Sequence, residues 1–345
     1  MSVTIDAKKL KFHVLGNGFD NVRNDSGKGT AVKIEVLNVD GQSAVIDDTE
    51  TYLWLMSSSG ALKKYDLETL EEVTQTTVPS DPTYHIYHPT NVENNIGVVF
   101  KNESGIKKVY IFDLTTDAII NSGEVDYIPT SAIKGIDCIL VDNVLKIVAE
   151  VQFRNSTTLY TLNINDLTMN KYTVSHACCG FVDDNKLYGY MVPEWFYQSK
   201  FIYGYNADGS IAWQVEGANP KFPNLSDNIS GFGNLGFIWI PCKVNDIWKL
   251  GKFVWSGSTD FQTPHPIKTI GKFDSMPNLA NYPNYYAVAH DYGRTRTVFR
   301  TSIGLYLCDY NDLELLDNSS GYYPIGIRNR TIICTDYSKT YVMRI

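Results

Sequence analysis

Hydrophobic residues occur along this chain in short runs, many of them alternating with polar residues, and long stretches with helical spacing are nearly absent. Clusters of Asn, Asp, Gly and Ser separate the runs. Apolar residues that alternate over about four to eight positions predict half-buried β-strands, and polar clusters of this kind predict tight turns. The pattern therefore predicts an all-β protein.

One strand-and-turn pattern recurs: an apolar run closed in most copies by Asp or Asn, then a turn and another strand. The residues that mark this position are Asp66, Asp113, Asn163, Asn206, Trp255 and Asp309, and the steps between them are 47, 50, 43, 49 and 54 residues. An Asp or Asn suits a hairpin because its side chain accepts hydrogen bonds from backbone N–H groups two residues on. Steps of this length are typical of a repeated unit of four strands, which takes about 40 to 50 residues.

Each unit can be divided into four strands, and six units cover about residues 43–323. The first predicts strands at Ser43–Asp48, Tyr52–Met56, Leu62–Leu67 and Glu72–Thr76, and the fourth at Gly180–Asp183, Leu187–Val192, Phe201–Tyr205 and Ile211–Val215. Three strands follow the sixth unit, at Tyr323–Ile327, Thr331–Thr335 and Thr340–Ile345, and one strand, Val32–Val39, precedes the first. Together they make a seventh unit, with the N-terminal strand as its outer edge.

This arrangement resembles the β-propeller superfamily over about residues 30–345. The resemblance implies a seven-bladed β-propeller with four-stranded antiparallel blades, closed by the N- and C-terminal strands. The Trp-Asp and Gly-His signatures of WD-repeat proteins are absent, and Tyr205–Trp213 looks like the docking motif of quinoprotein-type propellers. That motif implies shared blade geometry rather than a bound quinone. Residues 1–29 are predicted to form a separate N-terminal arm. This arm either packs on the propeller or on a partner, or it is simply an ordered tail.

Composition narrows the range of partners. The chain has 23 Tyr, 15 Phe and 6 Trp, and its net charge is −8, which argues against nucleic acid because that ligand needs clustered Lys and Arg. The one basic grouping, which we interpret as a solvated strand face, is Arg294, Arg296, Arg300, Arg328 and Arg330. Neither a signal peptide nor an apolar run of membrane-spanning length is visible. The six cysteines lack framework spacing, so a cytoplasmic protein is expected. A component of a virus particle would also fit the missing signal peptide, the N-terminal arm and the Asn- and Tyr-rich surface.

Several groupings could carry chemistry, and each has a plainer interpretation. His85 and His88 are ligand-capable but lie beside prolines in a predicted loop, and His176, Cys178 and Cys179 sit on a strand whose adjacent side chains diverge. His290 and Asp291 could form a general base pair. The acidic pairs Asp47-Asp48 and Asp183-Asp184 fit turns between the first and second strands. No metal or cofactor is predicted.

The loops that join the fourth strand to the next first strand (d–a), and the second to the third (b–c), emerge on one face and are aromatic. The predicted binding residues on this face are Tyr84, His85, His88, Trp195, Phe196, Tyr197, Phe222, Tyr282 and Tyr285. Exposed aromatic residues dominate binding hot spots, although the same rings could instead plug the channel. We therefore expect a non-enzymatic module that binds a protein or glycan, such as a tail or host-attachment protein of a virus or phage. The alternative is a propeller hydrolase or lyase with its site at the channel mouth.

Overall fold

The computed structural model describes residues 33–79, 83–89, 95–129, 138–152, 156–174, 201–205, 210–216, 232–234, 237–244, 247–254, 287–291, 296–301, 304–309, 313–317 and 321–345. All regular secondary structure within these ranges is β-strand. No helix long and apolar enough to cross a membrane is found in this described part of the chain. Hydrogen bonding joins the strands into seven antiparallel sheets, which we number in chain order.

Sheet 1 contains β2 (Gly41–Ile46), β3 (Tyr52–Ser57), β4 (Leu62–Asp66) and β5 (Glu72–Val73), and sheet 2 contains β6 (Thr83–Tyr87), β7 (Ile96–Glu103), β8 (Ile106–Asp113) and β9 (Ile119–Glu124). Sheet 3 contains β10 (Cys138–Val141), β11 (Val144–Gln152), β12 (Ser156–Asn163) and β13 (Met169–Val174). Sheet 4 contains β14 (Phe201–Tyr205) and β15 (Ile211–Glu216), and sheet 5 contains β16 (Phe232–Asn234), β17 (Phe237–Val244) and β18 (Ile247–Val254). Sheet 6 contains β19 (Ala287–His290), β20 (Arg296–Thr301), β21 (Gly304–Asp309) and β22 (Leu313–Asp317). Sheet 7 contains β23 (Tyr323–Arg328), β24 (Thr331–Thr335), β25 (Thr340–Arg344) and β1 (Lys33–Leu37).

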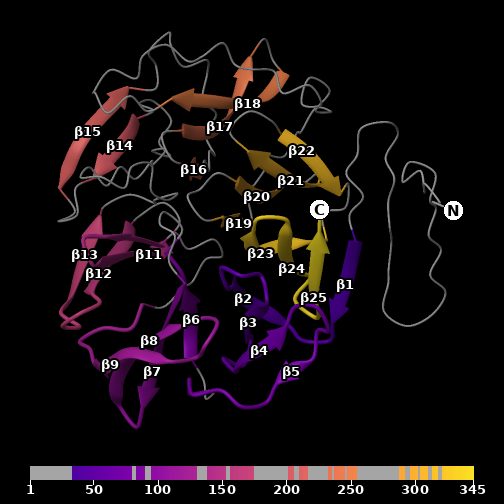
Figure 1. Ribbon diagram of the computed structural model, residues 1–345. Helices are drawn as coiled ribbons and strands as arrows, with labels where there is room; N and C mark the ends of the chain where they lie inside the picture. Colours follow the sequence, from indigo (N-terminus) through magenta and orange to yellow (C-terminus); the bar gives the residue numbers. More distant parts are fainter. Residues whose placement is uncertain are drawn as a thin grey trace, which may run out of the picture.

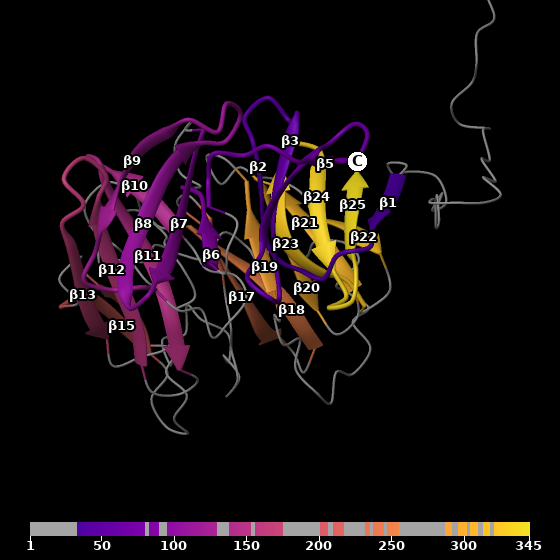
Figure 2. The same cartoon turned by 90° about the horizontal axis from the view of Figure 1, so that it is seen from below.

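The sheets follow one another around a common centre, with β2, β6, β19 and β23 among the strands nearest to it (Figure 1). Figure 2 shows the strands running between the two faces of this ring. We call the strands of each sheet a to d, from the centre outward. The end with the a–b and c–d turns is the turn face, and the end with the b–c turns and d–a connections is the loop face.

The ring is joined by strands from the two ends of the described chain. β1 pairs with β25 in antiparallel register, from Lys33 opposite Arg344 to Leu37 opposite Thr340. β1 is also the outer edge of sheet 7, whose order is β1-β25-β24-β23. The predicted completion of the last sheet by an N-terminal strand is confirmed.

The expectation of seven four-stranded blades is met only in part. Five sheets have four strands, whereas sheet 4 shows two strands and sheet 5 shows three in the described residues. β14 and β15 coincide with the third and fourth strands predicted for the fourth unit, but its first two predicted strands, Gly180–Asp183 and Leu187–Val192, lie outside the described residues. The predicted arm, residues 1–29, lies outside them too. The described residues therefore show fewer than seven complete blades.

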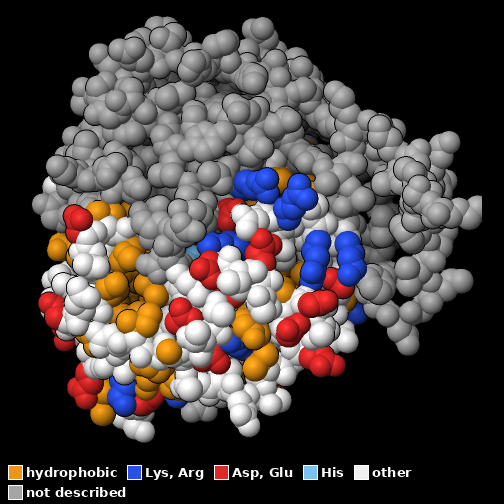
Figure 3. Space-filling model, viewed as in Figure 1, with side chains coloured by type: hydrophobic (Ala, Val, Ile, Leu, Met, Phe, Trp, Pro, Cys, Tyr) orange, Lys and Arg blue, Asp and Glu red, His pale blue; other side chains and the backbone are white. Residues whose placement is uncertain are grey.

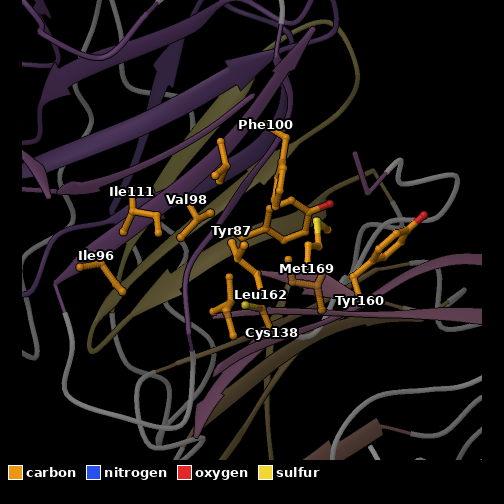
Figure 4. Close-up of a cluster of buried hydrophobic side chains, with 12 residues drawn as sticks. Tyr87, Ile96, Val98, Phe100, Ile111, Cys138, Tyr160, Leu162 and Met169 are labelled. Carbon is orange, nitrogen blue, oxygen red and sulfur yellow. The ribbon is translucent and has the colours of Figure 1, made fainter. Parts of the chain in front are cut away.

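Apolar side chains fill the spaces between neighbouring sheets. The cluster between sheets 2 and 3 draws on both of them, and Tyr87, Phe100 and Tyr160 are among its members (Figure 4). Between sheets 1 and 2, the fully buried Trp54 ring meets Phe112 edge-on at 4.9 Å and donates its indole N–H to the Leu114 carbonyl at 2.8 Å. Since each buried aliphatic or aromatic side chain contributes about 1.5–3 kcal/mol, this packing is what holds the sheets in the ring.

Three of the residues that mark the repeat, Asp66, Asp113 and Asn163, form the predicted turns in the described part of the chain. Asp66 Oδ1 accepts hydrogen bonds from the N–H groups of Glu68 and Thr69, at 2.9 and 2.8 Å. Asp113 Oδ1 accepts from Thr115 and Thr116 in the same way, at 3.0 and 2.7 Å. The repeat is therefore visible in turn chemistry as well as in strand spacing.

Candidate functional site: a tyrosine cluster on the loop face

Four tyrosines gather at the loop-face end of sheet 7. Tyr322 meets Tyr341 edge-on with ring centroids 4.8 Å apart, and Tyr323 meets Tyr337 at 4.4 Å. The guanidinium of Arg300, from the end of β20 in sheet 6, lies 3.8 Å from the centroid of the Tyr323 ring. We call these four tyrosines and Arg300 the tyrosine cluster.

The sheet register places the cluster at this end. Tyr323 begins β23 opposite Thr335, the last residue of β24, and Tyr337 lies in the b–c turn that follows. Arg300 pairs with Leu305 next to the b–c turn of sheet 6. Because the inner strand of sheet 7 and the second strand of sheet 6 approach each other here, Arg300 can cover the Tyr323 ring from the neighbouring sheet.

The b–c turn of sheet 7 is held by the carboxylate of Asp336. Its Oδ1 accepts from the N–H groups of Ser338 and Lys339, both at 2.8 Å, and its Oδ2 accepts from Tyr341 Oη at 2.6 Å. Burial raises the pKa of Asp336, but the hydrogen bonds from Tyr341, Ser338 and Lys339 outweigh burial and hold this pKa well below its usual range. The carboxylate is therefore ionised at neutral pH and fixes the turn.

Tyr337 has an unusual backbone conformation within this turn. Its φ is +73°, in the left-handed region that costs a residue with a Cβ about 1–2 kcal/mol. Its N–H donates to Thr335 Oγ1 at 3.0 Å, and its side chain is 48% exposed. A bulky ring is thus held outward on the loop face by a turn in which glycine would be less strained.

The predicted binding residues fall into two groups. Trp195, Phe196, Tyr197, Phe222, Tyr282 and Tyr285 lie outside the described residues. Tyr84 and His85 do not lie in a loop as predicted, because strand β6 begins directly after Pro82 and contains both. Its pairing with β7 shifts between Thr83 and Ile86, so both residues sit in a β-bulge. The neighbouring proline favoured a loop in the sequence, whereas the Thr, Tyr and Ile residues of this segment favour a strand.

His88 is described, and it lies at the opposite face from the one predicted. It follows the inner strand β6, so it belongs to the a–b end of sheet 2, which is the turn face. Its Nδ1 lies 2.9 Å from the Ile96 carbonyl, and its Nε2 lies 3.4 Å from Arg328 Nη1. A carbonyl can only accept, so Nδ1 carries the proton and Nε2 faces Arg328 as an acceptor. Burial, with the Arg328 charge adding to it, lowers the pKa of His88 to about 4.

Other titratable groups on the turn face bond neighbouring sheets together. Asp47 is buried and accepts from the Tyr52 N–H at 2.8 Å and, from sheet 2, the Thr115 hydroxyl at 2.7 Å. Asp291 accepts from the Asn329 N–H at 2.9 Å, which joins sheets 6 and 7. The predicted partner of Asp291, His290, ends β19. The described part of the chain contains no group of three or more His, Cys, Asp or Glu arranged to hold a metal ion.

This geometry can be set beside solved structures. The β-propeller domain of Cps50 (Swd1) from Myceliophteria thermophila is similar over 90% of this chain and 98% of its own, with a TM-score of 0.54 and 10% identity. This chain has a β-propeller fold. Hydrazine synthase from Kuenenia stuttgartiensis is similar to the propeller over 89% of this chain and 96% of its own, also with a TM-score of 0.54 and 10% identity. No family model and no curated protein matches the sequence. At this identity the two likenesses show the fold alone.

Sequence reasoning assigned aromatic residues to the loop face of the propeller but missed the tyrosine cluster. Its signals are the Tyr322-Tyr323 pair before a proline and a tyrosine in the turn Asp336-Tyr337-Ser338-Lys339. Neither signal says that the two segments meet. That information comes from the pairing of β23 with β24.

Proposed function

We propose that this propeller is a protein-interaction module that contacts its partner through the tyrosine cluster. The observation that carries the proposal is the exposed ring of Tyr337, 48% accessible, on a backbone at φ +73°. Nine non-glycine residues of the described chain have a positive φ, and Tyr337 is the one aromatic residue among them. Strained backbone of this kind persists only where the surrounding structure imposes it, and it is frequent at functional sites.

The chemistry of the cluster supports a protein partner. Tyrosine and arginine are enriched among hot-spot residues of protein interfaces, because they provide a large apolar area together with polar atoms at the tip. Here the Tyr323 ring contacts both the Tyr337 ring and the guanidinium of Arg300, which is itself buried. Such prior ordering lowers the entropy lost when a partner binds.

We also propose that the ring contains seven blades. Seven sheets in ring order, with sheets 4 and 5 next to undescribed residues, support a propeller of seven blades. Binding by the remaining predicted aromatic residues, a glycan ligand, docking by residues 1–29, a place in a virus or phage particle and the cytoplasmic location stay predictions from the sequence. The alternative of a hydrolase or lyase has no described side-chain cluster in its favour.

The test compares the proteins that purified variants retain. Wild type, Tyr337→Gly and a matched control, Ile120→Ser, are immobilised and exposed to extract of the source cells, and bound proteins are quantified by mass spectrometry. Ile120 is 56% exposed on the outer strand β9 of another sheet. A partner that binds through the cluster is retained by wild type and by the control, and its binding falls about tenfold or more with Tyr337→Gly. If all three variants retain the same proteins in equal amounts, the proposal is wrong.

A further inference from the structure

The tyrosine cluster presents aromatic walls to a partner. Tyr337 is exposed, and Tyr322, Tyr323 and Tyr341 are half-buried, so part of each of the four residues is accessible. The planes of Tyr322 and Tyr341 meet at 71°, and those of Tyr323 and Tyr337 meet at 55°. Rings that meet at such angles form an uneven surface, whereas parallel rings would form a flat platform. A ligand with ridges of its own fits this surface better than a flat one.

The charged groups of this cluster are mostly covered or already bonded. Asp336 accepts from two backbone N–H groups of its own turn and from the hydroxyl of Tyr341. Arg300 is only 7% exposed, and its guanidinium lies over a tyrosine ring. The turn itself carries one exposed cation, Lys339. A highly charged ligand therefore has few groups to pair with here, and an uncharged segment fits better.

The opposite end of sheet 7, on the turn face, has a different surface. Figure 3 shows acidic and basic side chains next to one another around β1 and β25. Glu35 Oε1 lies 2.7 Å from Lys33 Nζ, and its Oε2 lies 3.2 Å from Arg344 Nε. Because these charges pair with one another, charge does not mark a ligand site at that end. The tyrosine cluster is the end of sheet 7 that suits an uncharged ligand.

Three common ways of binding a peptide do not fit the residues of the cluster. Addition of a strand needs a free sheet edge, whereas β25 is paired on both sides and β23 lies toward the centre of the ring. Docking of an amphipathic helix needs a hydrophobic groove with several anchor pockets, but Tyr337 is the one exposed large hydrophobic residue in the described part of sheet 7. Recognition of a phosphorylated segment needs clustered arginines, and the one arginine of the cluster, Arg300, is buried. Docking of a polyproline II helix needs aromatic rings, which are present.

We propose that the tyrosine cluster binds a proline-rich segment of its partner in the polyproline II conformation. This inference rests on the proposed function, because it names the chemistry of the segment that the cluster contacts. A polyproline II helix has about three residues per turn, so its proline rings form ridges that can pack between tyrosine rings. The helix is preformed, which lowers the entropy lost on binding. Its solvated carbonyl groups can accept hydrogen bonds from tyrosine hydroxyls.

The test uses full-length protein and a decaproline peptide labelled with fluorescein, followed by fluorescence anisotropy. The informative variant is Tyr337→Leu, which keeps a large apolar side chain at this position but removes the aromatic ring. The matched control is Tyr127→Leu, which makes the same change on a tyrosine that is 38% exposed and follows β9 of sheet 2. A labelled glycine–serine peptide of the same length is the control ligand. Circular dichroism and thermal unfolding confirm that each variant is folded.

The expected result is saturable binding of decaproline that weakens about tenfold or more with Tyr337→Leu and is unchanged with Tyr127→Leu. Equal binding by wild type and Tyr337→Leu, or binding of the glycine–serine peptide as tight as that of decaproline, overturns the inference. If wild type does not bind decaproline while Tyr337→Gly still loses protein partners, the inference is wrong and the proposed function stands. If decaproline does not bind and Tyr337→Gly retains every partner, both are wrong.

Discussion

The turns between the first and second strands on the turn face and the Asp336 turn on the loop face use polar side chains differently. On the turn face, Asp47, Asp291 and Asn329 bond to residues of a neighbouring sheet. On the loop face of sheet 7, Asp336 bonds mostly within its own turn and thereby holds the Tyr337 ring outward. Bonds between sheets resist separation of the blades, whereas bonds within one turn fix a surface without binding it to the next blade. The turn-face bonds are therefore expected to add to the stability that core packing provides, and the tyrosine cluster is expected to determine binding.

The largest expected effect comes from the ion pair that joins sheets 1 and 2. Lys64 Nζ lies 2.5 Å from Asp117 Oδ1, and both residues are buried. Asp117→Ala leaves the buried ammonium without its counter-charge and should lower the free energy of unfolding by about 3–5 kcal/mol. Urea denaturation measures this loss.

The control is an exposed pair on the same sheet. Lys63 Nζ lies 2.6 Å from Glu72 Oε2, and both side chains are about 40% exposed. Glu72→Ala should cost no more than about 1 kcal/mol. Equal losses in the two variants would show that burial between sheets adds nothing to this contact.

The strand pattern was the part of the fold that the sequence predicted best. The apolar run and the terminal Asp of the first unit predicted Leu62–Leu67, and β4 is Leu62–Asp66. The pairing of the N-terminal strand with β25 was also predicted, because one unmatched strand and three unmatched strands complete a sheet. Local periodicity and turn chemistry determine these features, and both can be read from neighbouring residues.

The candidate site could not be predicted in the same way. Arg300 and Tyr323 belong to different repeat units and come together because β20 and β23 lie in neighbouring sheets. The left-handed conformation of Tyr337 opposes the preference of its residue type, since the surrounding turn imposes it. His88 was assigned to the loop face because Pro82, directly before β6, favoured a loop over a strand at this point of the sequence. Each of these features depends on tertiary packing.

A smaller effect should come from His88, as a dependence of stability on pH. Its pKa is about 4 in the folded protein against an ordinary value of 6.5, because it is buried next to Arg328. The unfolded chain therefore binds the extra proton between these two values. The stabilisation is complete above about pH 6.5 and falls by up to about 3 kcal/mol as the pH drops toward 4.

Urea denaturation across this pH range measures the effect, and His88→Gln is the matched variant because its side chain does not titrate. The slope of stability against pH should become smaller in His88→Gln. Asp336 adds a slope of its own near pH 4, because its carboxyl protonates in the unfolded chain before it does in the folded protein, but this slope is the same in wild type and His88→Gln and cancels in the comparison. An unchanged slope would mean that His88 is not held neutral beside Arg328.

The smallest change in stability is expected at Tyr337, although its effect on binding is expected to be large. Tyr337→Gly removes a left-handed strain of about 1–2 kcal/mol. It also loses a ring contact of about 0.5–1.5 kcal/mol and adds about 0.4–1 kcal/mol of chain entropy to the unfolded state. These changes nearly cancel.

Tyr337→Ala loses the same ring contact but keeps the strain, so it should be about 1 kcal/mol less stable than Tyr337→Gly. Thermal unfolding of the two variants measures the difference, and a glycine variant less stable than the alanine variant would show that the turn does not strain residue 337.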